Sequence, residues 1–160
     1  MGSLVAPAEP ATPGTAQTDL VARPFRWALR ALITVHALDA FTQAILAGRF
    51  LSGDFAMLKT HLDNANFGVS SISSLQIIAA VLYWRPGGGR SWPLFASLAL
   101  TGVEAVQILL GVNRILGVHI PLGVLIILST AALAVWAWRP GYGRRRQNAK
   151  RRTESTRGPA

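Results

Sequence analysis

Two histidines, His61 and His119, stand near the starts of apolar segments that are long enough to cross a bilayer. An imidazole nitrogen is a common axial ligand of haem iron, and two imidazoles on opposite faces would complete the coordination of the metal. The chain has no cysteine, so thiolate ligation, iron–sulfur clusters and disulfides are excluded. The pair therefore makes a b-type haem (haem b) the leading candidate cofactor.

A similar stretch of sequence precedes each histidine. The two stretches share an acidic residue, a glutamine, a glycine and an arginine in the same order: Asp39, Gln43, Gly48 and Arg49 before His61, and Glu104, Gln107, Gly111 and Arg114 before His119. This pattern predicts two helical hairpins that repeat in parallel about an axis along the membrane normal. Such an axis would place the two imidazoles opposite each other.

The depths of the two histidines can be compared by counting to the tryptophans near the ends of their segments. His61 lies 23 residues before Trp84, and His119 lies 19 residues before Trp138. The difference corresponds to about 6 Å along an α-helix. Helix tilt or a different helix start could absorb it.

Small and basic residues near the histidines suit the same cofactor. Gly68 and Gly123 lie on or near the helical faces below them and would leave room for a flat ligand, although close helix packing also uses small residues. Arg49 and Arg114 could neutralise the haem propionates. Snorkelling side chains that anchor helix ends are the alternative interpretation of these arginines.

A second set of polar residues lies within the apolar segments. His36, Asp39 and Gln43 share one helical face at spacings i, i+3 and i+7, and Glu104 and Gln107 follow a similar pattern. Ionisable residues inside a membrane are costly and often functional. We expect Asp39 to pair with His36, and Glu104 to be protonated or to bond to Gln76 or Gln107. A proton path, a quinone or ligand pocket, and a structural network all remain open.

The elements that position these residues are apolar runs. The chain is 51% hydrophobic and 14% charged, and four runs of about 20 residues are each long enough to span a bilayer. They cover roughly residues 27–47, 67–84, 92–112 and 118–138. Helices are expected, because the alternation of membrane β-strands is absent. The lipid bilayer is therefore a partner of this chain.

The basic residues indicate topology. Most arginines and lysines fall on one side of the predicted spans: Arg23, Arg26, Arg30, Arg85, Arg90, and the stretch from Arg139 to Arg157. The positive-inside rule then predicts that both termini are cytoplasmic. All five tryptophans fall at the same predicted interface. Topology accounts for the positive charge, so no nucleic-acid partner is expected.

Three segments follow from these patterns. We expect a disordered cytoplasmic arm over residues 1–22, a four-helix transmembrane domain over residues 23–140, and a basic cytoplasmic tail over residues 141–160. The loop Arg49–Thr60 mixes apolar and polar residues in a way that predicts a short interfacial helix. The fold class is an all-α, polytopic membrane four-helix bundle.

The pattern resembles one four-helix half of the haem A synthase family, over roughly residues 27–138. In that family, histidines on the second and fourth helices of a half bind haem toward the outer side, and His61 and His119 stand at matching positions. The chain is also similar to small bacterial membrane proteins with Gln-x-x-Leu-Ala-Gly at the end of the first helix, here Gln43–Gly48. Leu62 departs from the synthases, which often have arginine there. The resemblance implies haem binding rather than haem synthesis.

We therefore expect a multi-pass bacterial plasma-membrane protein that binds haem through His61 and His119 and transfers electrons near the outer face, with a redox partner or a quinone. No residue is assigned a catalytic role. A cofactor-free transporter or ligand-binding protein that uses His36, Asp39 and Glu104 is the first alternative. An accessory subunit of a larger membrane complex is the second, and the bundle could also form a homo-oligomer.

Overall fold

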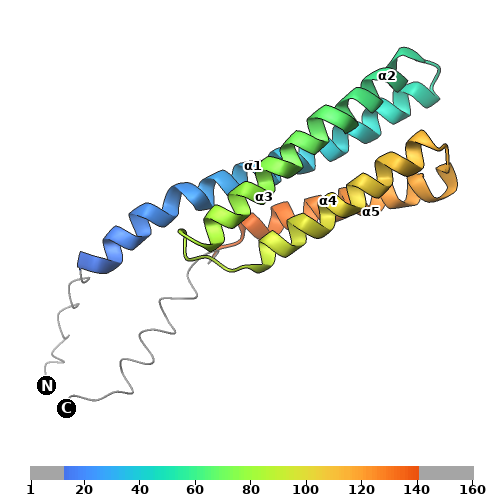
Figure 1. Cartoon of the computed structure of the whole chain (residues 1–160). Coiled ribbons are helices and arrows are strands. Elements are labelled where there is room, and N and C mark those ends of the chain that lie inside the picture. Colours follow the sequence, from blue (N-terminus) through green and yellow to red (C-terminus); the bar gives the residue numbers. More distant parts are fainter. Residues whose placement is uncertain (1–12, 141–160) are drawn as a thin grey trace, which may run out of the picture.

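The computed structural model of the chain describes residues 13–140, which form helices joined by short connections (Figure 1). The elements in order are α1 (Pro13–Leu51), α2 (Ala56–Asp63), the π-helix η1 (Asn64–Val69), α3 (Ser70–Trp84), α4 (Trp92–Val112) and α5 (Leu116–Trp138). No strand occurs within this part of the chain. The prediction of an all-α four-helix bundle is confirmed.

In the described part of the chain, four helical segments are long and apolar enough to cross a membrane: Leu20–Leu51, Ala56–Trp84, Trp92–Val112 and Leu116–Trp138. The second segment joins α2, η1 and α3 into one continuous span. Their length and hydropathy make the chain a multi-pass membrane protein.

The boundaries differ from the predicted ones in two places. Helix α1 begins at Pro13, so residues 13–22, which were expected in a disordered arm, are helical. The segment Arg49–Thr60, predicted to form a short interfacial helix, is divided between the end of α1, a turn and the start of α2. Helix α2 continues to Asp63, so His61 lies inside a helix rather than at its start. Residues 1–12 and the predicted basic tail, 141–160, lie outside the described residues.

The helices form a closed ring of neighbours. Helix α1 packs against α3 and α5, and α4 packs against the same two helices. Helices α1 and α4 are therefore diagonally opposite, as are α3 and α5. Figure 1 shows that α1 begins and α5 ends at the same end of the bundle. We call this the terminal end, and the opposite one, which carries the α1–α2 and α4–α5 connections, the loop end.

The interior alternates apolar and polar layers. One apolar cluster lies toward the terminal end and consists of Leu29, Ile33, Ala79, Ala80, Tyr83, Leu94, Leu133 and Ala137. A smaller one lies toward the loop end and consists of Ala40, Leu100 and Ile126. Of the buried polar residues in the described part of the chain, His36, Ser97 and Thr130 lie between the two clusters along α1, α4 and α5. Ser73 and Gln76 lie on α3, and Glu104 lies one turn beyond Leu100 toward the loop end.

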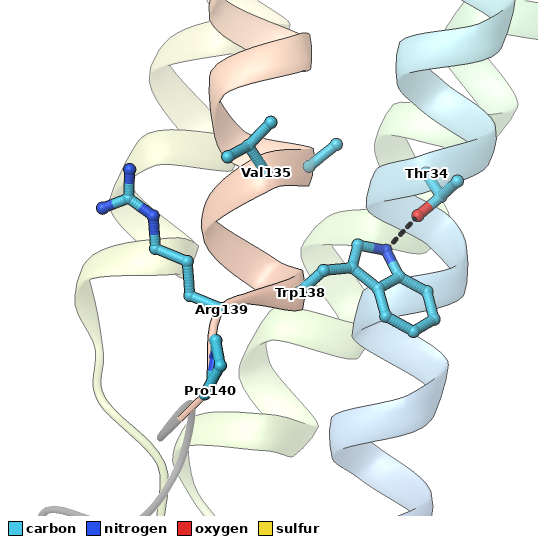
Figure 2. Close-up of a pocket in the computed structure, with 6 residues that line it drawn as sticks. Thr34, Val135, Trp138, Arg139 and Pro140 are labelled. Carbon is cyan, nitrogen blue, oxygen red and sulfur yellow. Dashed lines mark hydrogen bonds between the residues drawn. The ribbon is translucent and has the colours of Figure 1, made fainter.

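Tryptophans mark the terminal end, as predicted. Trp92 and Trp136 pack with ring centroids 4.0 Å apart. Trp138 donates from its indole Nε1 to Thr34 Oγ1 at 3.0 Å, which ties α5 to α1 beside an open groove of about 470 Å³ (Figure 2). An indole with its N–H satisfied suits a position where a helix leaves the hydrocarbon layer.

Candidate functional site

The structure brings the two predicted haem ligands together at the loop end. The ring centroids of His61 on α2 and His119 on α5 lie 6.3 Å apart, and their planes are inclined by 72°. Both side chains are partly buried. The contact joins the second and fourth membrane segments across the diagonal of the bundle.

Each ring is held by the same kind of hydrogen bond. His61 Nδ1 lies 3.1 Å from the main-chain oxygen of Gln43, and His119 Nδ1 lies 2.9 Å from that of Gln107. A carbonyl oxygen can only accept, so Nδ1 carries the hydrogen and Nε2 keeps its lone pair. A hydrogen bond of this kind commonly orients a metal-binding histidine. The sequence pattern places each glutamine before its histidine, but it does not predict these contacts.

The glutamines stand at equivalent positions of the predicted repeat, which itself remains a prediction. Their side chains behave differently. The Gln107 amide donates to the carbonyl of His119 at 2.8 Å, so Gln107 holds His119 through two bonds. A Cβ on Gly123 would come within 2.9 Å of the Gln107 amide nitrogen, so the missing side chain at Gly123 is what admits this bond. The Gln43 amide has no hydrogen-bond partner within residues 13–140.

The space beside the two predicted small residues is occupied by neighbouring side chains. Gly68 accommodates the side chain of Asn64, one turn earlier, and Gly123 accommodates Gln107. Gly111, in contrast, lies directly against His119, where a Cβ would come within 2.8 Å of the ring carbon Cε1. The expectation that Gly68 and Gly123 leave room for a flat ligand is therefore corrected: they allow polar side chains to approach the backbone.

The predicted basic residues also lie at the loop end, and both are exposed. Arg49 forms an ion pair with Asp54 at 2.6 Å. Arg114 lies in the connection between α4 and α5 with φ of 57°. Within the described residues, neither guanidinium forms a hydrogen bond with either histidine.

A π-helical segment lies between His61 and α3. Such a turn contains one more residue than an α-helical turn and is frequent at functional sites. His61 lies four residues further from Trp84 than His119 does from Trp138. The wider turn of η1 accommodates part of this difference, and the two rings lie close together. Within it, Asn64 donates to Asp39 Oδ1 at 2.9 Å.

Several of the polar residues within the apolar segments form a buried hydrogen-bond network between α1 and α4, which are diagonally opposite. His36 on α1 bonds through Nδ1 to Gln76 Oε1 at 2.9 Å and through Nε2 to Glu104 Oε1 at 2.6 Å. The predicted pairing of Asp39 with His36 is wrong, because Glu104 takes that place and Asp39 turns to Asn64. Glu104 was expected to be protonated or to bond to Gln76 or Gln107, and in the structure it forms hydrogen bonds with His36 and Ser73.

The donor and acceptor roles of the hydrogen-bond partners determine where most of the hydrogens in this network lie. The Gln76 amide nitrogen donates to Ser97 Oγ at 2.9 Å, and Ser97 donates to the carbonyl of Pro93 at 2.8 Å. Gln76 Oε1 is then the atom that faces His36, so His36 Nδ1 carries a hydrogen. Ser97 was not among the predicted site residues, although it lies seven residues before Glu104 and so shares its helical face.

The contact between His36 and Glu104 holds one proton. Ser73 donates to Glu104 Oε2 at 2.6 Å. Between His36 Nε2 and Glu104 Oε1, also 2.6 Å apart, two bare lone pairs would repel. The pair is therefore either imidazolium with carboxylate or imidazole with carboxylic acid, and both forms are neutral overall. This neutrality explains how a carboxyl group is tolerated inside an apolar span.

Four buried side-chain atoms near the two contacts have no hydrogen-bond partner among the described residues: Asp39 Oδ2, Gln43 Nε2, Gln43 Oε1 and Gln107 Oε1. Asp39 lies one turn from His36, and Gln43 lies one turn further toward the loop end. These atoms thus lie between the His36–Glu104 pair and the two histidines. Buried polar atoms in proteins usually have a hydrogen-bond partner, either another protein group or ordered water.

Comparisons of the chain with protein-family models, with curated proteins and with solved structures give no match. Function is therefore inferred from the site itself.

Proposed function

We propose that this protein binds a b-type haem through the Nε2 atoms of His61 and His119 and transfers electrons near the loop-end face of the membrane. The supporting observation is the pair of imidazoles on diagonal segments, each with Nδ1 bonded to a glutamine carbonyl. Both Nε2 lone pairs are thereby left for a metal.

The separation of the rings agrees with ligation of one metal ion. An imidazole nitrogen binds a metal at about 2 Å, and the ring centroid lies roughly 1 Å behind that nitrogen, so opposed ligands would have centroids about 6 Å apart. The observed separation is 6.3 Å. The two rings are therefore spaced as two axial ligands of one ion would be.

The surrounding donor set favours haem over a bare ion. Within residues 13–140, no group of three or more His, Cys, Asp or Glu side chains gathers to hold a metal. A bare zinc ion takes at least three protein ligands, whereas a porphyrin supplies four nitrogens itself and needs only axial ligands. Two isolated imidazoles in an apolar bundle fit the second case.

Each neighbouring residue would then have a defined task. The carbonyls of Gln43 and Gln107 fix the ring orientations and make the imidazoles better ligands. Arg49 and Arg114 would stabilise the propionates at the loop end. The haem, when bound, supplies one-electron redox chemistry, while the protein sets its potential through ligation and burial.

The spectrum of the purified protein tests this function. Protein produced with haem available should carry stoichiometric haem with a low-spin Soret band, and His61→Ala and His119→Ala should each abolish that spectrum. His36→Gln provides the matched control, because it removes the third histidine of the chain, which is engaged with Gln76 and Glu104. A colourless protein, or unchanged spectra in both alanine variants, would contradict haem ligation.

A cofactor-free proton or ligand transporter is the second candidate, and the buried contact between His36 and Glu104 favours it. Intramembrane carboxyl groups often lie on ion or proton pathways. This function predicts a colourless protein whose transport depends on Glu104 and survives His119→Ala. Flux measurements in liposomes distinguish it from haem binding.

A further inference from the structure

We propose that the His36–Glu104 pair is a proton-binding site that takes up a second proton when the histidine site at the loop end is reduced. The coupling rests on the proposed function, whereas proton binding by the pair does not. The electron comes from a one-electron donor and the proton from water at the loop end, so one negative and one positive charge enter together.

The geometry of Glu104 allows the second proton. With one proton the pair is neutral, and Ser73 donates to Glu104 Oε2 at 2.6 Å. When Oε2 is protonated, the hydroxyl of Ser73 must turn and accept instead, which a rotatable hydroxyl can do. The imidazolium of His36 then donates from Nε2 to Glu104 Oε1, and the pair carries one positive charge.

The electrostatic reason for coupling is the low dielectric of the bundle. An electron added to a buried site is poorly screened there, so a compensating positive charge nearby is strongly favoured. The His36–Glu104 pair is 5% exposed or less at both residues. It lies on the same helix faces as Gln43 and Gln107, whose carbonyls hold the two histidine rings.

Few other groups compete for this proton. Helix α1 contributes Asp39, the other carboxyl group near the pair, which accepts a hydrogen bond from the amide of Asn64 on η1. Helix α3 presents Ser73 and Gln76, which are neutral. On the remaining helices, the buried polar side chains at this level are also neutral hydroxyls: Ser97 on α4 and Thr130 on α5.

The orphaned atoms supply the route between the loop end and the pair. Asp39 Oδ2 and both side-chain amide atoms of Gln43 are buried and have no hydrogen-bond partner among residues 13–140. Each such atom is costly in a membrane unless a hydrogen bond satisfies it. Hydrogen-bonded water commonly satisfies buried polar atoms. Water held by Asp39 and Gln43 would join His36 to the loop end in steps of about one helical turn.

Potentiometric titration at several pH values tests the coupling. In the wild type we expect the midpoint potential to fall by about 59 mV per pH unit, which is one proton per electron. Glu104→Gln should flatten this slope. Thr42→Val, on an exposed face of α1, is the matched control and should keep the full slope. A flat wild-type profile would overturn the coupling.

The proton-binding pair determines the slope at equilibrium, whereas the path through Asp39 determines the rate of proton uptake. Asp39→Asn should leave the slope at equilibrium unchanged and slow proton uptake after rapid reduction by about tenfold. A merely structural role for Asp39 would change neither. An unchanged uptake rate in this variant would overturn the route.

Infrared spectroscopy tests proton binding without any haem. On acidification, the wild type should gain a deuterium-sensitive carboxylic-acid C=O band that Glu104→Gln lacks. If the protein is colourless and the band titrates, the proposed function fails and the proton site stands. If haem binds but no band titrates, the proton site fails and the proposed function stands.

Discussion

Gly111 lies against the imidazole of His119, and a methyl group on Gly111 would come within 2.8 Å of the ring carbon Cε1 and 3.1 Å of Nδ1. The ring therefore occupies the space that the glycine leaves open and bonds to the carbonyl of Gln107 one turn earlier on α4. Gly48, the equivalent residue of the predicted repeat, has nothing within 4 Å of such a methyl.

Gly111→Ala should displace the His119 ring from the Gln107 carbonyl. Losing a bond that orients a ligand lowers metal affinity by about 10–100-fold, and we expect a loss of this size in haem affinity. Gly102→Ala on the same helix is the control, because its added methyl meets nothing within 4 Å. Haem titration of both proteins measures the difference; equal affinities would show that Gly111 does not position the ring.

The inclination of the imidazole planes has a spectroscopic consequence. The planes of His61 and His119 are 72° apart, close to perpendicular. Nearly perpendicular imidazoles leave two iron d orbitals close in energy, so the oxidised protein should give a strongly anisotropic low-spin signal in electron paramagnetic resonance. A rhombic signal, typical of parallel planes, would contradict this arrangement of the ligands.

Glu104→Leu should be strongly destabilising. It leaves His36 and Ser73 without their partner inside the bundle, and breaking a buried pair typically costs about 3–5 kcal/mol. Asp63→Ala breaks the exposed ion pair with Lys59 and should cost less than about 1 kcal/mol. Unfolding in detergent followed by circular dichroism measures both. Equal losses would mean that the buried pair contributes no more than a surface one.

Arg114→Gly should stabilise the fold. Arg114 has φ of 57°, a left-handed conformation that costs an L-residue about 1–2 kcal/mol and glycine almost nothing. Arg49, the other loop-end arginine, lies in the last turn of α1, where Arg49→Gly should instead cost about 1 kcal/mol. Thermal midpoints should therefore move in opposite directions. A shift of both in the same direction would contradict the strain at Arg114.

Much of the fold was predictable because the membrane limits the choices. Apolar length alone implies four helices, and the connections between them require His61 and His119 to lie at the same end. Tryptophan and arginine positions likewise predict which ends of the helices lie together. These properties depend on local composition, which a single sequence displays directly.

The partners of the polar residues could not be predicted in this way. Spacing along α1 favours the pair of His36 with Asp39, one turn apart, but the packing of α1 against α3 and α5 turns His36 across the diagonal to Glu104. Asp39 accepts a hydrogen bond from Asn64, the first residue of η1, where the helical register changes. The composition of the sequence does not predict a π-helix.

The glycines also separate what the sequence predicts from what helix packing decides. Sequence alone predicted small residues near the histidines, because helix spacing places Gly68 and Gly123 below them. Only the tertiary structure decided that these two admit Asn64 and Gln107, while Gly111 receives the imidazole of His119. The physical reason is that helical periodicity assigns a residue to a face, whereas the contacts of that face depend on how neighbouring helices rotate and shift against it.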